Sequence, residues 1–177
     1  MSLRIRRACE DDLPAITRIY NEAGVNTTAS WRLQPVTVAD RREWFQRQQA
    51  DNFPVLVIEV DGEVAGFASY GTFRSLEGYR FTVEHSIYLS EQYRAAGAGR
   101  SLMRALMDVA RGQGIHVMVG VVDGDNEQSL RFHESLGFVE AGRLNQIGHK
   151  FGRWLDCVFM TYIFEGPQSD PSGEPVR

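Results

Sequence analysis

The sequence predicts an α/β (α+β) fold in which helices flank a central sheet. Strand-like segments with a two-residue periodicity are separated by helix-like segments with a 3.6-residue periodicity along the whole chain. Two β-branched runs on either side of Asp61-Gly62 predict a hairpin, and therefore an antiparallel strand pair. The 177 residues contain no internal repeat and suit a single domain. We expect this domain over residues 1–165 and a disordered Pro-, Gly- and Ser-rich tail over residues 166–177.

The first third of the chain is predicted to contain one strand and two helices. Residues 3–7 alternate apolar and charged side chains, as a short strand does. Acidic residues 10–12 place negative charge where a helix would begin, and apolar residues at helical spacing run from 13 to 20. After a loop, residues 38–49 have the pattern of a second helix.

Three strands are predicted next, and the first two form the hairpin. Residues 54–60 are β-branched, and residues 64–70 resume the strand pattern after the turn. Residues 81–89 form the third strand, whose alternate side chains should face opposite sides of the sheet. One set is Val83, His85, Ile87 and Leu89, and the other is Thr82, Glu84, Ser86 and Tyr88.

The C-terminal half is predicted to contain two helices and three strands. Helical spacing of apolar residues stops where glycines follow, at Gly112 and at Gly137. The predicted elements are helix 102–110, strand 116–122, helix 126–136 and a strand pair over 138–147 and 154–164.

Composition narrows the classes of partner. A formal charge of −4 argues against a general nucleic-acid or anionic-membrane binder, which would need a surplus of Lys and Arg. No apolar run approaches the roughly 18 residues of a membrane span, and the N-terminus has no signal-peptide core, so a cytoplasmic protein is expected. The two cysteines form no C-x-x-C pair, so no metal site is expected. A small molecule or another protein is the expected partner.

The stretch YRAAGAGRSL, residues 93–102, places Gly97 and Gly99 between a strand and a helix. Unpartnered backbone N–H groups at such a helix N-terminus form an anion site. A nucleoside-triphosphate loop is excluded because Arg100-Ser101 follows Gly99 where Lys would be required, and a dinucleotide site lacks its third glycine. On these residues alone, a turn without any ligand is the favoured interpretation.

A family resemblance favours a ligand. Residues 94–99 resemble the R/Q-x-x-G-x-G/A signature of the GNAT superfamily of N-acyltransferases, in which the turn's amides hold the pyrophosphate of coenzyme A. The spacing of Asn126, Ser129, His133, Gly137 and Phe138 resembles the superfamily's following helix. The segments TVEHS and KFGRWLD are similar to the branch that acetylates phosphinothricin, methionine sulfoximine and methionine sulfone, and the match runs from about residue 3 to 164.

The resemblance implies a fold, a co-substrate and a set of binding residues. The sheet should be mixed, mostly antiparallel, and open between strands 81–89 and 116–122 to admit acetyl-CoA. The residues expected to bind it are the backbone N–H groups of Ile87, Tyr88 and Leu89, the turn residues Arg94, Ala95, Ala96, Gly97, Ala98, Gly99 and Arg100, and Asn126 and Ser129. Asn126 has a helix N-cap as its other interpretation. The resemblance also implies a homodimer.

Amide formation from a thioester requires a base, and Glu84 is the first candidate. It lies within an otherwise apolar strand, where burial would raise its pKa, and the matching glutamate is the proposed base of the family. A solvated strand carboxylate is the interpretation that the residue alone would equally allow. His85 should point to the other face and pack in the core or at a dimer contact. His133 stands where the wider superfamily commonly has a Tyr that gives a proton to the leaving thiolate. His133 is therefore a candidate for this general acid.

The acceptor is expected to be a small amino acid whose carboxylate pairs with arginine. Arg74 and Arg80 flank the loop between two predicted strands, and two solvated loop arginines are the alternative. The expected acceptor-binding residues are Phe73, Arg74, Glu77, Gly78, Tyr79, Arg80 and Glu84. The sequence therefore predicts acetylation of the α-amine of phosphinothricin, methionine sulfoximine, methionine sulfone or a similar compound. The alternatives are a protein N-terminal or polyamine acetyltransferase, and an acyl-CoA sensor without turnover.

Overall fold

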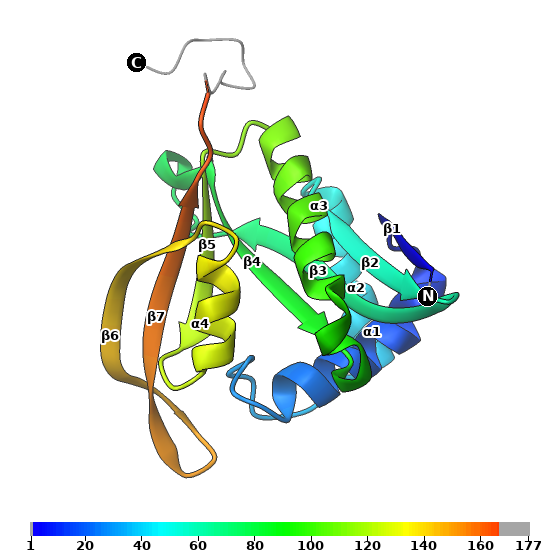
Figure 1. The fold of residues 1–177 in the computed structure, drawn as a ribbon, viewed down its shortest axis with the longest axis horizontal. Coiled ribbons are helices and arrows are strands. Elements are labelled where there is room, and N and C mark those ends of the chain that lie inside the picture. Colours follow the sequence, from blue (N-terminus) through cyan, green and yellow to red (C-terminus); the bar gives the residue numbers. More distant parts are fainter. Residues whose placement is uncertain (1, 167–177) are drawn as a thin grey trace.

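Seven strands form one sheet in the computed structural model, which describes residues 2–166 (Figure 1). The strand order is β1-β2-β3-β4-β5-β7-β6, and only β4 and β5 run parallel to each other. The strands are β1 Leu3–Arg7, β2 Val55–Val60, β3 Glu63–Thr72, β4 Thr82–Leu89, β5 Val117–Asp123, β6 Val139–Lys150 and β7 Arg153–Ile163. The mixed, mostly antiparallel sheet is thereby confirmed. Residues 167–177, nearly all of the expected tail, lie outside the described residues.

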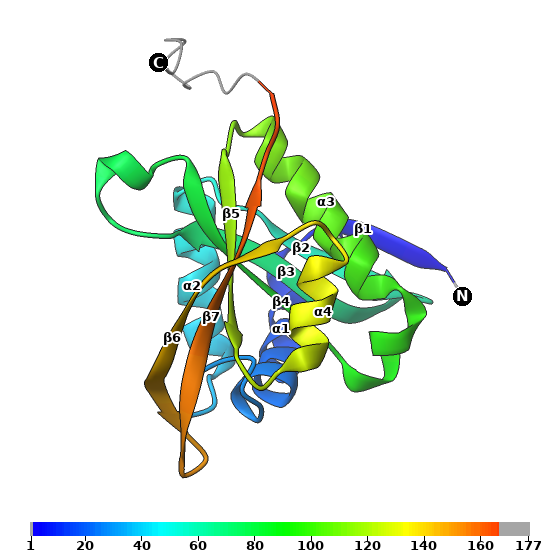
Figure 2. The same cartoon turned by 60° about the vertical axis from the view of Figure 1, so that its left-hand side comes forward.

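The helices cover both faces of the sheet. They are α1 Leu13–Ile19, α2 Val38–Ala50, α3 Ala98–Gly112 and α4 Glu127–Glu134. Figures 1 and 2 show α1 and α2 together on one face and α3 and α4 on the other. Within the described range no helix is both long and apolar enough to cross a membrane, and no group of His, Cys, Asp or Glu side chains is placed to hold a metal.

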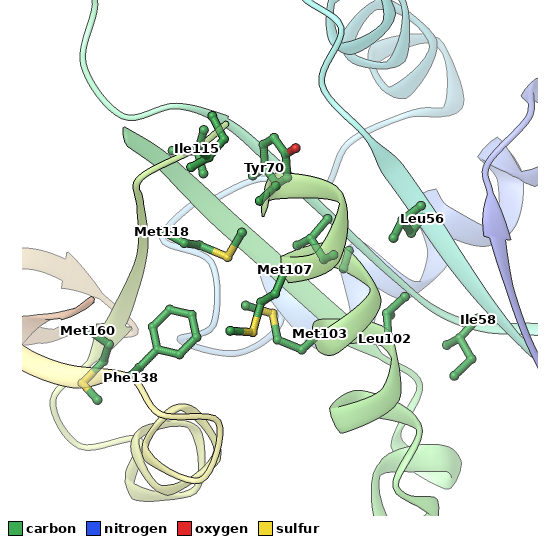
Figure 3. Close-up of a cluster of buried hydrophobic side chains, with 14 of the residues drawn as sticks. Leu56, Ile58, Tyr70, Leu102, Met103, Met107, Ile115, Met118, Phe138 and Met160 are labelled. Atoms are coloured by element: carbon green, nitrogen blue, oxygen red, sulfur yellow. The ribbon is translucent and has the colours of Figure 1, made fainter. Parts of the chain in front are cut away.

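The main core lies under α3, whose apolar stripe follows the predicted helical spacing. Leu102, Met103 and Leu106 are fully buried in the cluster that packs on the sheet. Figure 3 shows Leu102 and Met103 among the side chains of this cluster. Val83 and Ile87 of β4 belong to this cluster, whereas Tyr88 packs in a second cluster with α1 and α2. The predicted two-faced character of strand 81–89 is confirmed.

The sheet opens between β4 and β5. These strands pair only at Thr82, Val83 and Glu84, whereas β3 pairs with β4 as far as Leu89. From His85 onward, no described residue pairs with β4 on its β5 side. The opening that the resemblance implied is therefore confirmed, and it begins directly after Glu84.

The last strand pair is longer than the sequence indicated. The first strand was expected to end at Ile147, but β6 continues to Lys150. The turn consists of Phe151 and Gly152, both with positive φ (51° and 73°), which is the backbone of a tight two-residue hairpin turn. The segment KFGRWLD is thus the tip of the β6–β7 hairpin, with Gly148 and Lys150 buried although most of β6 is exposed.

Candidate active site

Two adjoining cavities lie along the opening of the sheet. The catalytic cavity, about 360 Å³, is lined by Tyr20, Ala29, Ser30, Trp31, Glu84, His85, Ser86, Ile87, Tyr88, Gly120, Val121, Val122, Asp123, Asn126, Ser129 and His133. The turn cavity, about 350 Å³, is lined by Ala23, Thr27, Ala29, Ile87, Tyr88, Leu89, Arg94, Gly97, Gly99, Arg100, Asn126, Gln128, Ser129 and Phe132. The two share Ala29, Ile87, Tyr88, Asn126 and Ser129, so together they form a path from the glycine turn to Glu84.

Glu84 is a half-buried carboxyl in the catalytic cavity. Burial raises its pKa above the ordinary value of 4.5, and the positive charge of Arg74 partly opposes that rise. A carboxyl group with a raised pKa holds a proton more strongly than one in water, which suits a general base.

Alternating backbone groups leave part of β4 free for a ligand. The carbonyl of Phe81 accepts hydrogen bonds from His116 and Val117 on the β5 side, whereas the N–H of Ser90 donates to Ala65 on the β3 side. Because main-chain groups alternate sides along a strand, those of Ile87 and Leu89 face the opening and those of Tyr88 face β3. Two of the three expected amides are thus placed for a ligand, and Tyr88 contributes its side chain to the cavity walls instead.

The glycine turn meets the turn cavity at the start of α3. Gly97 has φ of 72°, a conformation that favours glycine, and a Cβ added there would meet nothing within 4 Å. Ser101 N–H is bonded to the Gly97 carbonyl, so the amides of Ala98, Gly99 and Arg100 precede the first helical hydrogen bond. Such a terminus suits the pyrophosphate of coenzyme A.

Gly99 lies where α3 meets the end of β4. A Cβ added there would lie 2.8 Å from Leu89 Cδ1, so Gly99 allows α3 to pack closely against the strand. Arg94 and Arg100 line the same cavity, with Arg100 Nη1 donating to the Ser135 carbonyl. Ala95 and Ala96 lie in a short 3-10 helix, Glu91–Ala96, just before the turn.

Asn126 is the N-cap of α4, and it also lies at the two cavities where a ligand role was predicted for it. Its Oδ1 accepts from the Ser129 N–H at 3.1 Å as the N-cap of α4, and the residue lines both cavities. Ser129 lines the same two cavities.

His133 and His85 form a buried pair on the floor of the catalytic cavity. Their Nε2 atoms are 3.2 Å apart, and His133 Nδ1 donates to the Ser129 carbonyl at 2.7 Å. With its proton on Nδ1, His133 accepts at Nε2 from His85, and burial lowers the pKa of both rings. Gly120 leaves room for this pair, since a Cβ there would lie 2.8 Å from each Nε2. His85 is buried as expected, but it lines the catalytic cavity together with Glu84 instead of lying away from it.

The expected acceptor-binding loop lies outside the catalytic cavity of the single chain. Phe73, Arg74, Glu77, Gly78, Tyr79 and Arg80 are not among the residues that line it, and all but Phe73 are exposed. Arg74 and Arg80 stack on the neighbouring rings of Phe73 and Phe81, each at 4.4 Å from guanidinium carbon to ring centroid. Of these residues, Arg74 affects Glu84 through its positive charge, which lowers the pKa of that carboxyl.

Sequence reasoning missed the loop that forms the outer wall. Ala29, Ser30 and Trp31 line the catalytic cavity and follow a π-helical turn, Tyr20–Val25, that continues α1. The ring of Trp31 lies over Gly148, where an added Cβ would clash with it. No periodicity marks such a loop, because its position depends on contacts with a hairpin more than 100 residues away.

Lys150 fixes this loop. It is 3% exposed, and its Nζ donates to the carbonyls of Val25 and Thr27, both at 2.6 Å, and to that of Ser30. The ammonium satisfies carbonyls at the end of the π-helical turn that would otherwise lack partners. The β6–β7 hairpin therefore holds the cavity wall through Lys150 and Gly148.

A sheet opened beside a glycine turn, with a carboxyl group in the opening, can hold an acyl thioester next to an amine. The chain belongs to the GNAT family of acetyltransferases: residues 14–138, more than half of the chain, match the model described as Acetyltransferase (GNAT) family. It is an acetyltransferase whose co-substrate is acetyl-CoA.

Similar proteins indicate which branch of the GNAT family this chain resembles. The L-methionine sulfoximine/L-methionine sulfone acetyltransferase of Pseudomonas paraeruginosa is 46% identical over 97% of this chain and 100% of its own. The phosphinothricin N-acetyltransferase of Streptomyces viridochromogenes is 34% identical over 98% of this chain and 94% of its own. Among solved structures, a phosphinothricin acetyltransferase from Sinorhizobium meliloti in complex with acetyl-CoA has a TM-score of 0.90 and 33% identity, covering 99% and 94% of the two chains.

The glycine turn gives a first testable prediction. Gly97→Val is expected to raise the KM for acetyl-CoA about tenfold or more, because the left-handed backbone would be strained and the side chain would project toward the bound phosphates. Gly62→Val, also at positive φ and with open space around it, is the matched control in a distant turn. Equal KM values for acetyl-CoA in the two variants would contradict the assignment.

Proposed function

We propose that this enzyme transfers the acetyl group of acetyl-CoA to the α-amine of a small amino acid analogue such as methionine sulfone, methionine sulfoximine or phosphinothricin. The observation that carries the proposal is the place of Glu84, half-buried in the cavity that begins where β4 and β5 separate. The similar proteins support this acceptor class by their names.

Acetyl-CoA supplies the activated thioester. In the proposed mechanism Glu84 takes a proton from the acceptor amine, whose nitrogen then forms the new C–N bond as the C–S bond breaks. The N–H groups of Ile87 and Leu89 are available to the carbonyl oxygen and the pantetheine arm. The thiolate leaves with a proton from Glu84 or from water.

His133 is less suited to the role of acid than the sequence suggested. In the neutral ring the one N–H is donated to the Ser129 carbonyl, and Nε2 accepts from His85. We therefore assign His133 a role in ordering the cavity floor.

A panel of amines tests the acceptor. Protein, acetyl-CoA and methionine sulfone, methionine sulfoximine, phosphinothricin, a polyamine or a peptide should be mixed while free thiol is followed. Release of thiol with the amino acid analogues is expected. If only the peptide or the polyamine supports release, or if none of these amines does, the acceptor proposal is wrong.

We further propose that the enzyme is a cytoplasmic homodimer. Ile147, Phe151 and Trp154 are each more than half exposed around the tip of the β6–β7 hairpin, an apolar surface suited to a second copy. Light scattering should give twice the mass of one chain at assay concentrations. A monomeric mass would contradict this proposal.

A further inference from the structure

Arg41 is a buried cation that the reaction described above does not use. It lies on α2, is 8% exposed, and occupies a position on the buried face together with Phe45 and Gln48. Its Nε is buried and has no hydrogen-bond partner among the residues that the structure describes. A buried guanidinium normally pairs with a carboxylate, because leaving its N–H groups unpaired costs free energy.

Residues 2–166 supply aromatic faces but no carboxylate partner for this guanidinium. Its central carbon is 3.6 Å from the ring centroid of Tyr20 and 4.8 Å from that of Trp44. The neighbouring Asp40 uses its Oδ2 for the backbone and side chain of Thr37, as part of the α2 cap. Glu43 lies within 3.9 Å of Arg47 instead. Among the described residues, no acid forms an ion pair with Arg41.

Arg41 lines a third cavity, of about 350 Å³, which we call the arginine cavity. Its other lining residues are Tyr20, Arg32, Val36, Asp40, Glu43, Trp44, Arg47, Phe67, Ser69, Ser86 and Tyr88. Tyr20, Ser86 and Tyr88 also line the catalytic cavity, so the two cavities adjoin. Ser86 is the next residue after Glu84 on the same face of β4 and lies at the junction.

We propose that Arg41 binds the side-chain oxygens of the acceptor in the arginine cavity, as a subsite for a sulfonyl, sulfoximine or phosphinate group. The proposal rests on the proposed function and adds the determinant of its acceptor class. With the amine at Glu84, the acceptor side chain extends past Ser86 toward the guanidinium. The planar fork of Arg41 can donate to two oxygens of one such group, and Ser69 and Ser86 also line the cavity.

With this subsite, the enzyme discriminates between acceptors by the hydrogen bonds that a wrong acceptor fails to make with Arg41, rather than by the size of the acceptor. An acceptor with an apolar tail of similar length would fill the cavity and leave Arg41 unpaired. Sites built to hydrogen-bond a substrate group reject analogues that lack it more strongly than apolar pockets reject a misfit.

The decisive comparison uses methionine sulfone and norleucine as acceptors. In Arg41→Gln, the KM for methionine sulfone should rise at least about tenfold, while the KM values for norleucine and acetyl-CoA stay within about twofold. Arg42→Gln is the matched control, because Arg42 is the next residue of α2 but is exposed and faces Glu10 at 3.7 Å. A folded Arg41→Gln enzyme that keeps the parent preference for the sulfone would overturn the proposal.

A second measurement uses the unmodified protein and so does not depend on the folding of the variant. Methanesulfonate should inhibit competitively against methionine sulfone and not against acetyl-CoA. Inhibition that is competitive with acetyl-CoA alone, or no inhibition, would refute the subsite.

Failure of the proposed function can be recognised separately. If no amine is acetylated, equilibrium binding of methionine sulfone still reports on the subsite through the fluorescence of Trp44, which lines the cavity. Saturable quenching that is weakened about tenfold in Arg41→Gln would support the subsite even without turnover. Quenching that is identical in both proteins would overturn it.

Discussion

Replacing Glu84 by Gln is expected to lower kcat by about 10²- to 10⁴-fold at neutral pH, the range for loss of a positioned general base. Gln keeps the shape of the side chain and cannot accept the proton. In the parent enzyme the rate should fall as the pH drops through the raised pKa of Glu84, because only the carboxylate acts as a base. This acidic limb should be absent in Glu84→Gln, as a pH profile of kcat will show.

The substitution Glu84→Gln should lower activity without lowering the stability of the fold. A carboxyl whose pKa is raised in the folded state favours folding below its unfolded pKa, and that contribution is lost as the pH rises through the folded value. At neutral pH the neutral amide should therefore leave the Tm equal or higher. Glu77→Gln, on the exposed loop, is the control for both measurements. Parent-level turnover in Glu84→Gln across the pH range would show that another group is the base.

Replacing Lys150 by Met is expected to cost about 2–4 kcal/mol in the free energy of unfolding. The apolar side chain would fill much of the same volume but leave the carbonyls of Val25, Thr27 and Ser30 without their shared donor. Because residues 29–31 form the wall of the catalytic cavity, the KM for the acceptor should rise as well. Denaturant unfolding and steady-state kinetics measure the two effects.

The neighbouring residue offers a control for the hairpin itself. His149 is exposed and contacts Trp154, so His149→Gln should change neither the unfolding free energy nor the acceptor KM appreciably. A Lys150→Met protein as stable as the parent would mean that water can replace the ammonium at these carbonyls.

Regular elements were predictable because each has a local signal. The stripe of Leu102, Met103 and Leu106 indicated α3, and the Asp61-Gly62 turn indicated the β2–β3 hairpin. The family signature added the opening of the sheet, which depends on how β4 and β5 diverge and has no local pattern. The continuation of β6 past Ile147 was missed because a bulky Phe151 in a positive-φ turn is not a usual turn signal.

The site was only partly predictable, for a related reason. Glu84 and the turn glycines carry recognisable motifs, whereas Lys150 and Arg41 do not. Long cations are expected at the surface, so nothing in the sequence indicated that one would be buried among carbonyls and the other between aromatic rings. Only the tertiary arrangement of a hairpin, a loop and α2 gives these residues their surroundings.

The short contact between β4 and β5 has a consequence for the integrity of the domain. Three residue pairs join a four-stranded ladder, β1 to β4, to a three-stranded one, β5 to β7, and α3 packs across both. A ligand in the opening would contact the free edge of β4 on one side and α4 on the other. Bound acetyl-CoA would therefore help to hold the two parts of the sheet together. The free energy of unfolding should rise with the concentration of acetyl-CoA.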